Sequence, residues 1–323
     1  MNHPPTTLAK KGITQLLGLF VIVFMAVAFT ACGEEQITAP DPVPDPITRT
    51  FDLGEGVNLE MVLISAGTFK MGSTDSEVGS DSDETQHEVT ISKPFYLGKY
   101  PITVAQWKRF VAVTSYKTEA ETSGGAFKWD SKKSELELDP DTNWKHPGFR
   151  QGPTHPVVCV SWNDVQKFHG WLNALGLKNA TKFAMPTEAQ WEYACRAGTT
   201  KPFHFGTELN GTQANCNGIY PYGTNNQGPF WEKTTPVGKY PPNTWGVYDM
   251  HGNVWQWCSD WYGEYPEKPV KDPVGPLMGK HRVQRGGSWY DNAMYCRAAN
   301  RYGNNPALRF YYCGGRVFLP VEF

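Results

Sequence analysis

Three segments of the chain place apolar side chains at positions i, i+3 and i+4, the spacing of one face of a helix. These positions are Trp107, Phe110 and Val111; Phe168, Trp171 and Leu172; and Trp191, Ala194 and Cys195. Each segment opens with a hydroxyl residue that has a partner three residues later: Thr103 with Gln106, Ser161 with Asp164, and Thr187 with Gln190. Such pairs predict capping boxes, in which each side chain caps the other's backbone amide. We therefore expect three short helices whose tryptophans lie in the core.

Strand patterns are short and lie mainly before residue 101. The apolar, β-branched run 59–72, LEMVLISAGTFKMG, is broken at Ala66-Gly67 and predicts a hairpin. Residues 86–91 and 95–100 predict two further strands. The acidic segment 73–85 lacks the spacing of a calcium loop, so we expect it to be solvated. Residues 115–149 are polar with scattered Gly and Trp, which predicts a long surface insertion.

The stretch 282–319 contains three clusters without helical or strand period, which indicates loops. They are Tyr290-Asp291-Asn292, Tyr302-Gly303-Asn304-Asn305 and Phe310-Tyr311-Tyr312-Cys313. Tyr supplies contact area at low entropic cost, and Asn and Gly supply adaptable polar contacts. Asn and Gly alone would favour turns that only close the domain. The aromatic residues favour a recognition surface.

Composition limits the possible fold class and the possible kinds of binding partner. The 323 residues are 40% hydrophobic, with 12 Trp, 25 Pro and 32 Gly, which favours an irregular, loop-rich fold without long helices. The net charge is −2, and no basic stripe is present, so we expect no nucleic-acid partner.

The N-terminus has the pattern of an export signal. Lys10 and Lys11 precede an apolar run, 13–29, and a Thr30-Ala31-Cys32 sequence that resembles a bacterial lipoprotein cleavage site. We expect a signal peptide at 1–31, lipidation of Cys32, a Pro-rich acidic tether at 32–52 and one domain at 53–323. The alternatives are an ordinary signal peptide and an uncleaved membrane helix. The lipoprotein interpretation predicts a bacterial cell envelope location, at the outer membrane or cell surface, with membrane contact through the lipid only.

Six further cysteines permit disulfides in an exported protein, but they allow 15 pairings between which the sequence cannot choose. None forms a CxxC pair, which argues against structural zinc. They are Cys159, Cys195, Cys216, Cys258, Cys296 and Cys313.

Ordered motifs along the chain resemble the formylglycine-generating enzyme family, also called the sulfatase-modifying-factor domain. They are GTFKMGS, FYLGKYPITVAQW, HPVVCVSWNDV, MPTEAQWEYACRAG, WGVYDMHGNVWQWCSDW and RGGSW followed by CRAANR and GGRV. The likeness runs from about Leu59 to Leu319. It implies a single irregular α+β domain with a C-type-lectin-like core and little regular secondary structure.

The resemblance also implies a test for oxidase activity. The oxidases of this family hold copper(I) with two cysteines in a GGS-x2-C-x4-C pattern, whose positions here are Asp291 and Cys296. Copper(I) prefers soft thiolates, so this pair argues against copper and against a catalytic site. The resemblance offers Cys195 as a disulfide partner for Cys296. If the chain is an oxidase, its catalytic residue is Cys296, with a second thiolate from elsewhere, such as Cys313. The iron-dependent branch of the family needs a His-bearing helical domain that this chain lacks.

The C-terminal block is closest to the variable region of retroelement-diversified lipoproteins that share this fold. The resemblance places a variable region at about 286–317. Its twelve variable positions are the predicted ligand-binding residues given below, apart from Trp289. None of the twelve is Lys, Glu, Gln, Met or Trp, the residues that adenine mutagenesis of an AAC-type codon cannot produce. The fixed frame would be Trp289, Cys296, Arg297, Arg301, Pro306 and Arg309. The predicted ligand-binding residues are Trp289, Tyr290, Asp291, Asn292, Tyr295, Tyr302, Gly303, Asn304, Asn305, Phe310, Tyr311, Tyr312 and Cys313.

A calcium site is the remaining implication of the resemblance. Its ligands would be Asp249, Gly252, Val254 and Gln256. Oxygen donors suit this hard cation. A glycine turn between strands is an equally good interpretation of the same residues.

Together these patterns predict a lipid-anchored binding protein whose partner is a protein or glycan on another cell, a phage or a host. The alternatives are a copper-dependent formylglycine-generating oxidase or related peptide-modifying enzyme, and a structural envelope lipoprotein. The sequence gives no oligomeric state.

Overall fold

The computed structural model describes residues 45–180 and 182–321. The predicted signal peptide, the Cys32 lipidation site and most of the predicted tether lie outside these residues. Within the described part, no helix is both long and apolar enough to cross a membrane.

The regular elements are short, and most helices lie between an N-terminal and a C-terminal group of strands. In chain order the strands before the first helix are β1 (Thr48–Asp52), β2 (Asn58–Ile64), β3 (Gly67–Met71), β4 (His87–Ile91) and β5 (Phe95–Gly98). They are followed by α1 (Val104–Thr114), α2 (Glu119–Thr122), β6 (Ala126–Asp130), β7 (Glu135–Asp139), α3 (Trp162–Ala174) and α4 (Glu188–Arg196). The C-terminal part contains β8 (Trp255–Trp261), β9 (Val270–Lys271), β10 (Arg282–Arg285), the 3-10 helix η1 (Ala293–Cys296), β11 (Arg301–Asn304), β12 (Cys313–Gly315) and β13 (Phe318–Pro320). The fold is α+β with modest regular structure, as the sequence predicts.

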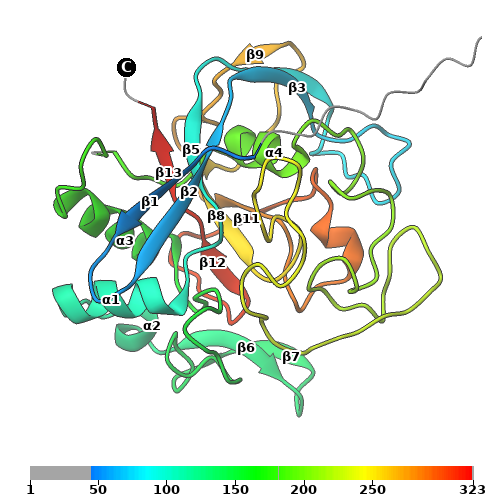
Figure 1. Ribbon diagram of the computed structural model, residues 1–323. Coiled ribbons are helices and arrows are strands. Elements are labelled where there is room, and N and C mark those ends of the chain that lie inside the picture. The colour runs from blue at the N-terminus through cyan, green and yellow to red at the C-terminus, as the bar shows by residue number, and fades with distance from the viewer. Residues whose placement is uncertain (1–44, 181, 322–323) are drawn as a thin grey trace, which may run out of the picture. The chain divides into compact units, whose positions relative to one another are not determined.

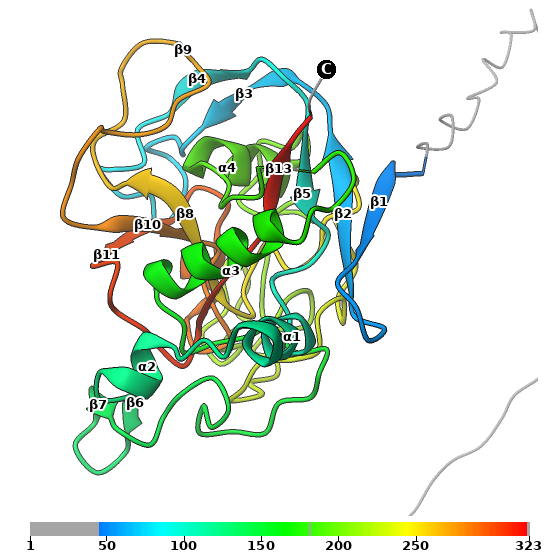
Figure 2. The same ribbon diagram turned by 90° about the vertical axis from the view of Figure 1, so that its left-hand side faces the viewer.

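Within residues 45–180 and 182–321, the strands form four separate sheets. Two have four strands, in the orders β1-β2-β5-β13 and β11-β10-β8-β12, and the smaller ones are β3-β4-β9 and β6-β7. The β3-β4-β9 sheet lies at one end of the domain and the β6-β7 hairpin at the opposite end in both views (Figures 1 and 2). Helix α4 packs against β3, β4, β8 and β10, so it connects the β3-β4-β9 sheet with the β11-β10-β8-β12 sheet.

The three predicted helices are confirmed. Helices α1, α3 and α4 each begin with the expected reciprocal capping box. Trp107 and Trp191 have no exposed surface, and Trp171 is also buried. Burial of these rings against the sheets, rather than intrinsic helix propensity, stabilises such short helices.

One strand prediction and the predicted end of the tether are wrong. The run 59–72 is not a hairpin, because β2 pairs with β1 and β5 while β3 pairs with β4, and the chain passes from one sheet to another at Ala66. The tether does not extend to residue 52, because β1 occupies 48–52. Phe51 of β1 is buried and packs edge-on against Phe183, which fixes this strand to the domain.

The acidic segment 73–85 is not fully solvated. Glu84 is buried, and its two carboxylate oxygens each accept a hydrogen bond of 2.8 Å from the guanidinium of Arg297. This contact joins the N-terminal part of the domain to the C-terminal block.

Candidate ligand-binding surface

Trp255 of β8 lies where the three predicted clusters meet. Its indole Nε1 donates a 2.8 Å hydrogen bond to the Asp291 carboxylate, and its ring lies 6.1 Å from that of Tyr302. Its backbone amide donates a 3.0 Å hydrogen bond to the Tyr312 carbonyl. One buried tryptophan therefore contacts a member of each cluster, although the clusters are separated in sequence.

The first and third clusters share a column of aromatic rings. The rings of Tyr290 and Tyr312 are nearly parallel with centroids 5.5 Å apart, and Tyr312 stacks on Phe310 at 5.2 Å. Tyr311 packs against Trp289 at 5.0 Å beside this column. Contacts at these distances are typical of favourable aromatic pairs.

The predicted ligand-binding residues divide by exposure. Tyr295 and Tyr302 are 41% and 56% exposed, and Asn305 is also exposed. The half-buried residues are Tyr290, Asp291, Asn292, Gly303, Asn304 and Tyr312. The buried ones are Trp289, Phe310, Tyr311 and Cys313. The prediction that these last four lie on the surface is wrong.

The segment 115–149 explains that burial and is more than a surface insertion. Its Phe127 amide donates to the Arg309 carbonyl at 2.9 Å, and its carbonyl accepts from the Tyr311 amide at 3.0 Å. Phe149 packs edge-on against Trp289 at 5.3 Å. The strand β6 thus pairs with the third cluster and covers it. Sequence reasoning missed this role because the segment has no apolar period.

The second cluster is not a loop. Residues 302–304 belong to the edge strand β11, where Tyr302 lies opposite Gln284. The side-chain amide of Asn304 donates to Gln284 at 3.0 Å, and Gln284 in turn donates to the thiol of Cys313 at 2.8 Å. Only one face of this short edge strand is buried, so its pattern is too weak to predict a strand.

Asp291 follows Tyr290 in a turn whose Asp291 amide donates a 3.2 Å hydrogen bond to the Ser288 carbonyl. Its carboxylate accepts hydrogen bonds from the Ser288 hydroxyl and from the indole of Trp255. Burial raises the pKa of Asp291 to about 6, and these two donors limit the rise. The carboxylate is therefore committed to the protein interior.

Buried arginines hold the chain between the clusters. Arg297 binds Glu84 as described above, and Arg301 binds Glu188 through Nε at 2.8 Å and Nη2 at 2.7 Å. Arg309 donates to the backbone carbonyl of Gly125 at 2.7 Å. These three residues were predicted to be part of a fixed frame, and their buried positions are consistent with that role.

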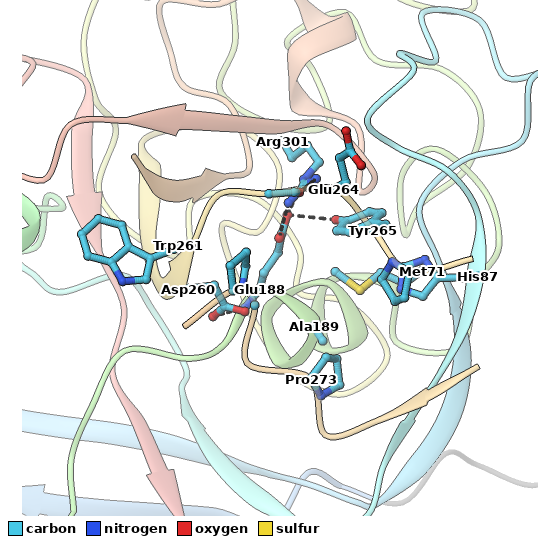
Figure 3. Close-up of a pocket in the computed structure, with 14 residues that line it drawn as sticks. Met71, His87, Glu188, Ala189, Asp260, Trp261, Glu264, Tyr265, Pro273 and Arg301 are labelled. Carbon is cyan, nitrogen blue, oxygen red and sulfur yellow. Dashed lines mark hydrogen bonds and ion pairs between the residues drawn. The ribbon is translucent and has the colours of Figure 1, made fainter. Parts of the chain in front are cut away.

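A partly open cavity of about 50 Å³ lies beside the second cluster. Figure 3 shows Glu188 between Arg301 and Tyr265, whose hydroxyl donates to Glu188 at 2.9 Å. Asp260 also lines the cavity, and its carboxylate accepts from the Glu188 amide at 3.0 Å. Burial and the nearby Glu188 charge raise the pKa of Asp260 to about 7.

The raised pKa of Asp260 should make the free energy of unfolding decrease as pH rises from acidic to neutral. Because its pKa is about 7 in the folded protein and 3.8 ordinarily, the folded state holds the proton more tightly. The contribution of Asp260 to the free energy of unfolding is fully present below pH 3.8 and is lost as pH rises through 7. We expect the melting temperature of Asp260→Asn, relative to the wild type, to increase from pH 4.5 to pH 7.5. Parallel thermal unfolding profiles for the two proteins would contradict this assignment.

The predicted calcium ligands do not fit a calcium ion. Both carboxylate oxygens of Asp249 accept hydrogen bonds, from the Gly238 amide at 2.8 Å and from Asn253 at 3.0 Å. The Gln256 side-chain oxygen accepts from the buried guanidinium of Arg316 at 2.8 Å, which also donates to the Asp249 carbonyl at 3.2 Å. The Gly252 carbonyl accepts from the Val254 amide at 2.9 Å. A fixed arginine charge and internal donors engage these oxygens. Calcium binding by the protein stays a prediction.

The cysteine pairings implied by the resemblance are also absent from the described residues. All six cysteines there are free and buried. Cys195 lies near the ring of His251, with Sγ 3.6 Å from Nε2, and does not pair with Cys296. Asp291 and Cys296 together do not fit copper(I), because the carboxylate is a hard donor already engaged by Ser288 and Trp255.

Comparison with known proteins identifies sequences that share these motifs. A family model described as the sulfatase-modifying factor enzyme 1-like domain matches residues 53–319. The formylglycine-generating enzyme of Mus musculus is 34% identical over 279 residues, which cover 76% of this chain and 71% of the relative. A Bos taurus protein named inactive C-alpha-formylglycine-generating enzyme 2 is 31% identical, covering 80% of this chain and 87% of the relative.

Solved structures agree on the fold. PvdO from Pseudomonas aeruginosa superposes with a TM-score of 0.69 at 30% identity, over 84% of this chain and 98% of that one. Treponema denticola variable protein 1 gives a TM-score of 0.62 at 22% identity, over 85% and 99% of the two chains. At that identity the second likeness concerns the fold alone.

Proposed function

Because the chain belongs to the family of sulfatase-modifying factor enzyme 1-like domains, we propose that it uses the family's fold to bind a partner rather than to oxidise a cysteine. Relatives named as formylglycine-generating enzymes and relatives named as inactive both match it, so membership alone does not select an activity. The choice between binding a partner and oxidising a cysteine depends on the residues of this chain.

The observation that carries the proposal is the gathering of the three clusters around Trp255. We define the contact surface as the exposed and half-buried tyrosines and asparagines of these clusters and of the adjoining η1: Tyr290, Asn292, Tyr295, Tyr302, Asn304, Asn305 and Tyr312. Stacked rings and buried arginines beneath it supply rigidity, which reduces the entropic cost of binding. Exposed tyrosines surrounded by amides are typical of protein recognition surfaces.

Asp291 supports binding over oxidation. A copper(I) oxidase needs two soft donors, and the first of the two positions carries a carboxylate tied to Ser288 and Trp255. The same carboxylate fixes the turn that presents Tyr290. Asp291 therefore has a positioning role that suits a contact surface.

We place this surface on a lipid-anchored envelope protein, with Cys32 as the anchor and a protein or glycan on another cell, a phage or a host as the partner. The mass of the mature N-terminal peptide tests the anchor. Variation of the surface by a retroelement has a genomic test: the codons of the variable positions should end in pyrimidines, and a near-copy should lie beside a reverse transcriptase. Absence of either would reject diversification without rejecting binding.

The double variant Tyr295→Ala/Tyr302→Ala should lose partner capture while it stays folded. Both side chains are largely exposed, so we expect the melting temperature to change by about 1 °C or less. Loss of two exposed tyrosines of the contact surface should reduce capture by roughly tenfold or more. Quantitative mass spectrometry of material captured on the immobilised full chain measures this loss.

The matched control for this experiment is Val113→Ala. Val113 lies on α1, outside the contact surface, and is 50% exposed. This variant should capture the same components as the wild type. If the double variant also captures them at wild-type levels, the surface is not the binding site.

A further inference from the structure

Two of the six buried cysteines come from distant parts of the chain and lie in one small apolar cluster. Cys216 and Cys296 have no exposed surface and share this cluster with Phe203, Leu209, Ala214, Tyr222 and Ala293. No motif of the chain links the two positions, and they are separated by a long stretch that contains β8, β9 and β10.

The backbone holds the two cysteine-bearing segments side by side. Asn217 forms a parallel bridge with Asn292, and its amide donates a 2.8 Å hydrogen bond to the Asp291 carbonyl. Farther along, the Ala293 amide donates to the Tyr220 carbonyl at 3.2 Å. The segment 217–220 therefore lies beside 291–293, next to Cys216 on one side and shortly before Cys296 on the other.

Cys296 is fixed from two further directions. Its backbone carbonyl accepts a 2.7 Å hydrogen bond from Nδ1 of His251. Gly287 has a positive φ of +68°, and a Cβ there would lie 2.6 Å from the Cys296 sulfur. Glycine at this position thus leaves room for the thiol. The other side of the Cys296 thiol faces Cys216, whose thiol, together with burial, raises the pKa of Cys296 well above its usual range.

We propose that Cys216 and Cys296 are the two halves of a disulfide that fastens the loop after residue 216 to η1. The two thiols lose two protons and two electrons to a disulfide-bearing oxidant such as oxidised glutathione, which leaves as two thiols. The bond joins segments that already share backbone hydrogen bonds, so its formation needs little rearrangement of the chain. This inference is independent of the proposed binding function.

Burial also determines when the bond forms. Thiolates, not thiols, attack disulfides, and the raised pKa of Cys296 keeps it protonated in the folded protein. Oxidation should therefore be rapid while the chain folds and slow once the cluster has closed. A folded, reduced protein should resist oxidised glutathione for much longer than a refolding one.

The test uses the full chain, reduced in denaturant and refolded in a glutathione redox buffer. After alkylation of free thiols, non-reducing digestion and mass spectrometry should show a peptide pair that links residues 216 and 296. Thiol titration in denaturant should find two fewer thiols than after reduction. Reduction should lower the melting temperature by roughly 5–10 °C, because the bond closes a long loop.

Two serine variants make the outcome decisive. Cys216→Ser should abolish the linked peptide and the effect of reductant on melting. Cys195→Ser removes another buried thiol of the domain and should leave both unchanged. A fully reduced refolded protein, or a linkage between other cysteines such as Cys159 and Cys313, would overturn the proposal.

Discussion

Replacing Arg285 with alanine is expected to lower the free energy of unfolding by roughly 3–5 kcal/mol, because it removes one of the buried cations that neutralise the carboxylates of Glu188 and Glu192. The Arg285 guanidinium has no exposed surface. It pairs with Glu192 and lies 3.4 Å from Glu188. It also donates to the Ala299 carbonyl at 2.7 Å. One side chain therefore connects β10 to α4 and to the segment before β11.

A loss of this size should reduce the melting temperature by on the order of 10 °C in a domain of this length. The matched control is Lys70→Ala, which breaks the ion pair with Glu88 at 3.2 Å, where both side chains are about half exposed. Surface pairs of this kind contribute about 0–1 kcal/mol. If Arg285→Ala melts within about 2 °C of the wild type, the buried network does not stabilise the fold.

Replacing Tyr311 with alanine should destabilise the domain by roughly 3 kcal/mol, within the range for large-to-small changes of buried aromatic residues. Its side chain is 7% exposed and packs against Trp289, Tyr290 and Phe149. Chemical denaturation of Tyr311→Ala, with Tyr302→Ala as the exposed control, measures the difference.

The contrast between these two tyrosines distinguishes core from contact surface. Tyr302→Ala should change the free energy of unfolding by about 0.5 kcal/mol or less. Equal effects of the two substitutions would show that burial by the β6-β7 hairpin is not what stabilises Tyr311. For this reason Tyr311 is unsuitable for a binding experiment, although its sequence position made it a candidate.

Local sequence patterns were sufficient where local interactions determine the structure. The three capping boxes satisfy backbone amides within one turn, so Thr103, Ser161 and Thr187 could be assigned without knowledge of their neighbours. The segment after residue 66 shows the opposite case. Ala66-Gly67 indicated a change of direction, but strand partners depend on distant residues, and β3 pairs with β4 rather than with β2.

Composition indicated where the candidate surface lies but not which residues belong to it. Tyrosine and asparagine clusters indicated the C-terminal block, and Trp255 contacts a member of each cluster. Phe310 and Cys313 have the same local pattern as exposed residues, yet they are buried. The partner that covers Phe310, β6, lies far away in the chain and has no pattern of its own.

The sequence by itself determined the family, the α+β class, the capped helices and the region that carries the tyrosine clusters, because motifs and caps are local in the chain. Only the tertiary structure decided which tyrosines face solvent, which cysteines are neighbours and which carboxylate each buried arginine binds. Those outcomes depend on contacts between segments that are distant in the chain. No local pattern encodes how such contacts bury side chains or pair their charges.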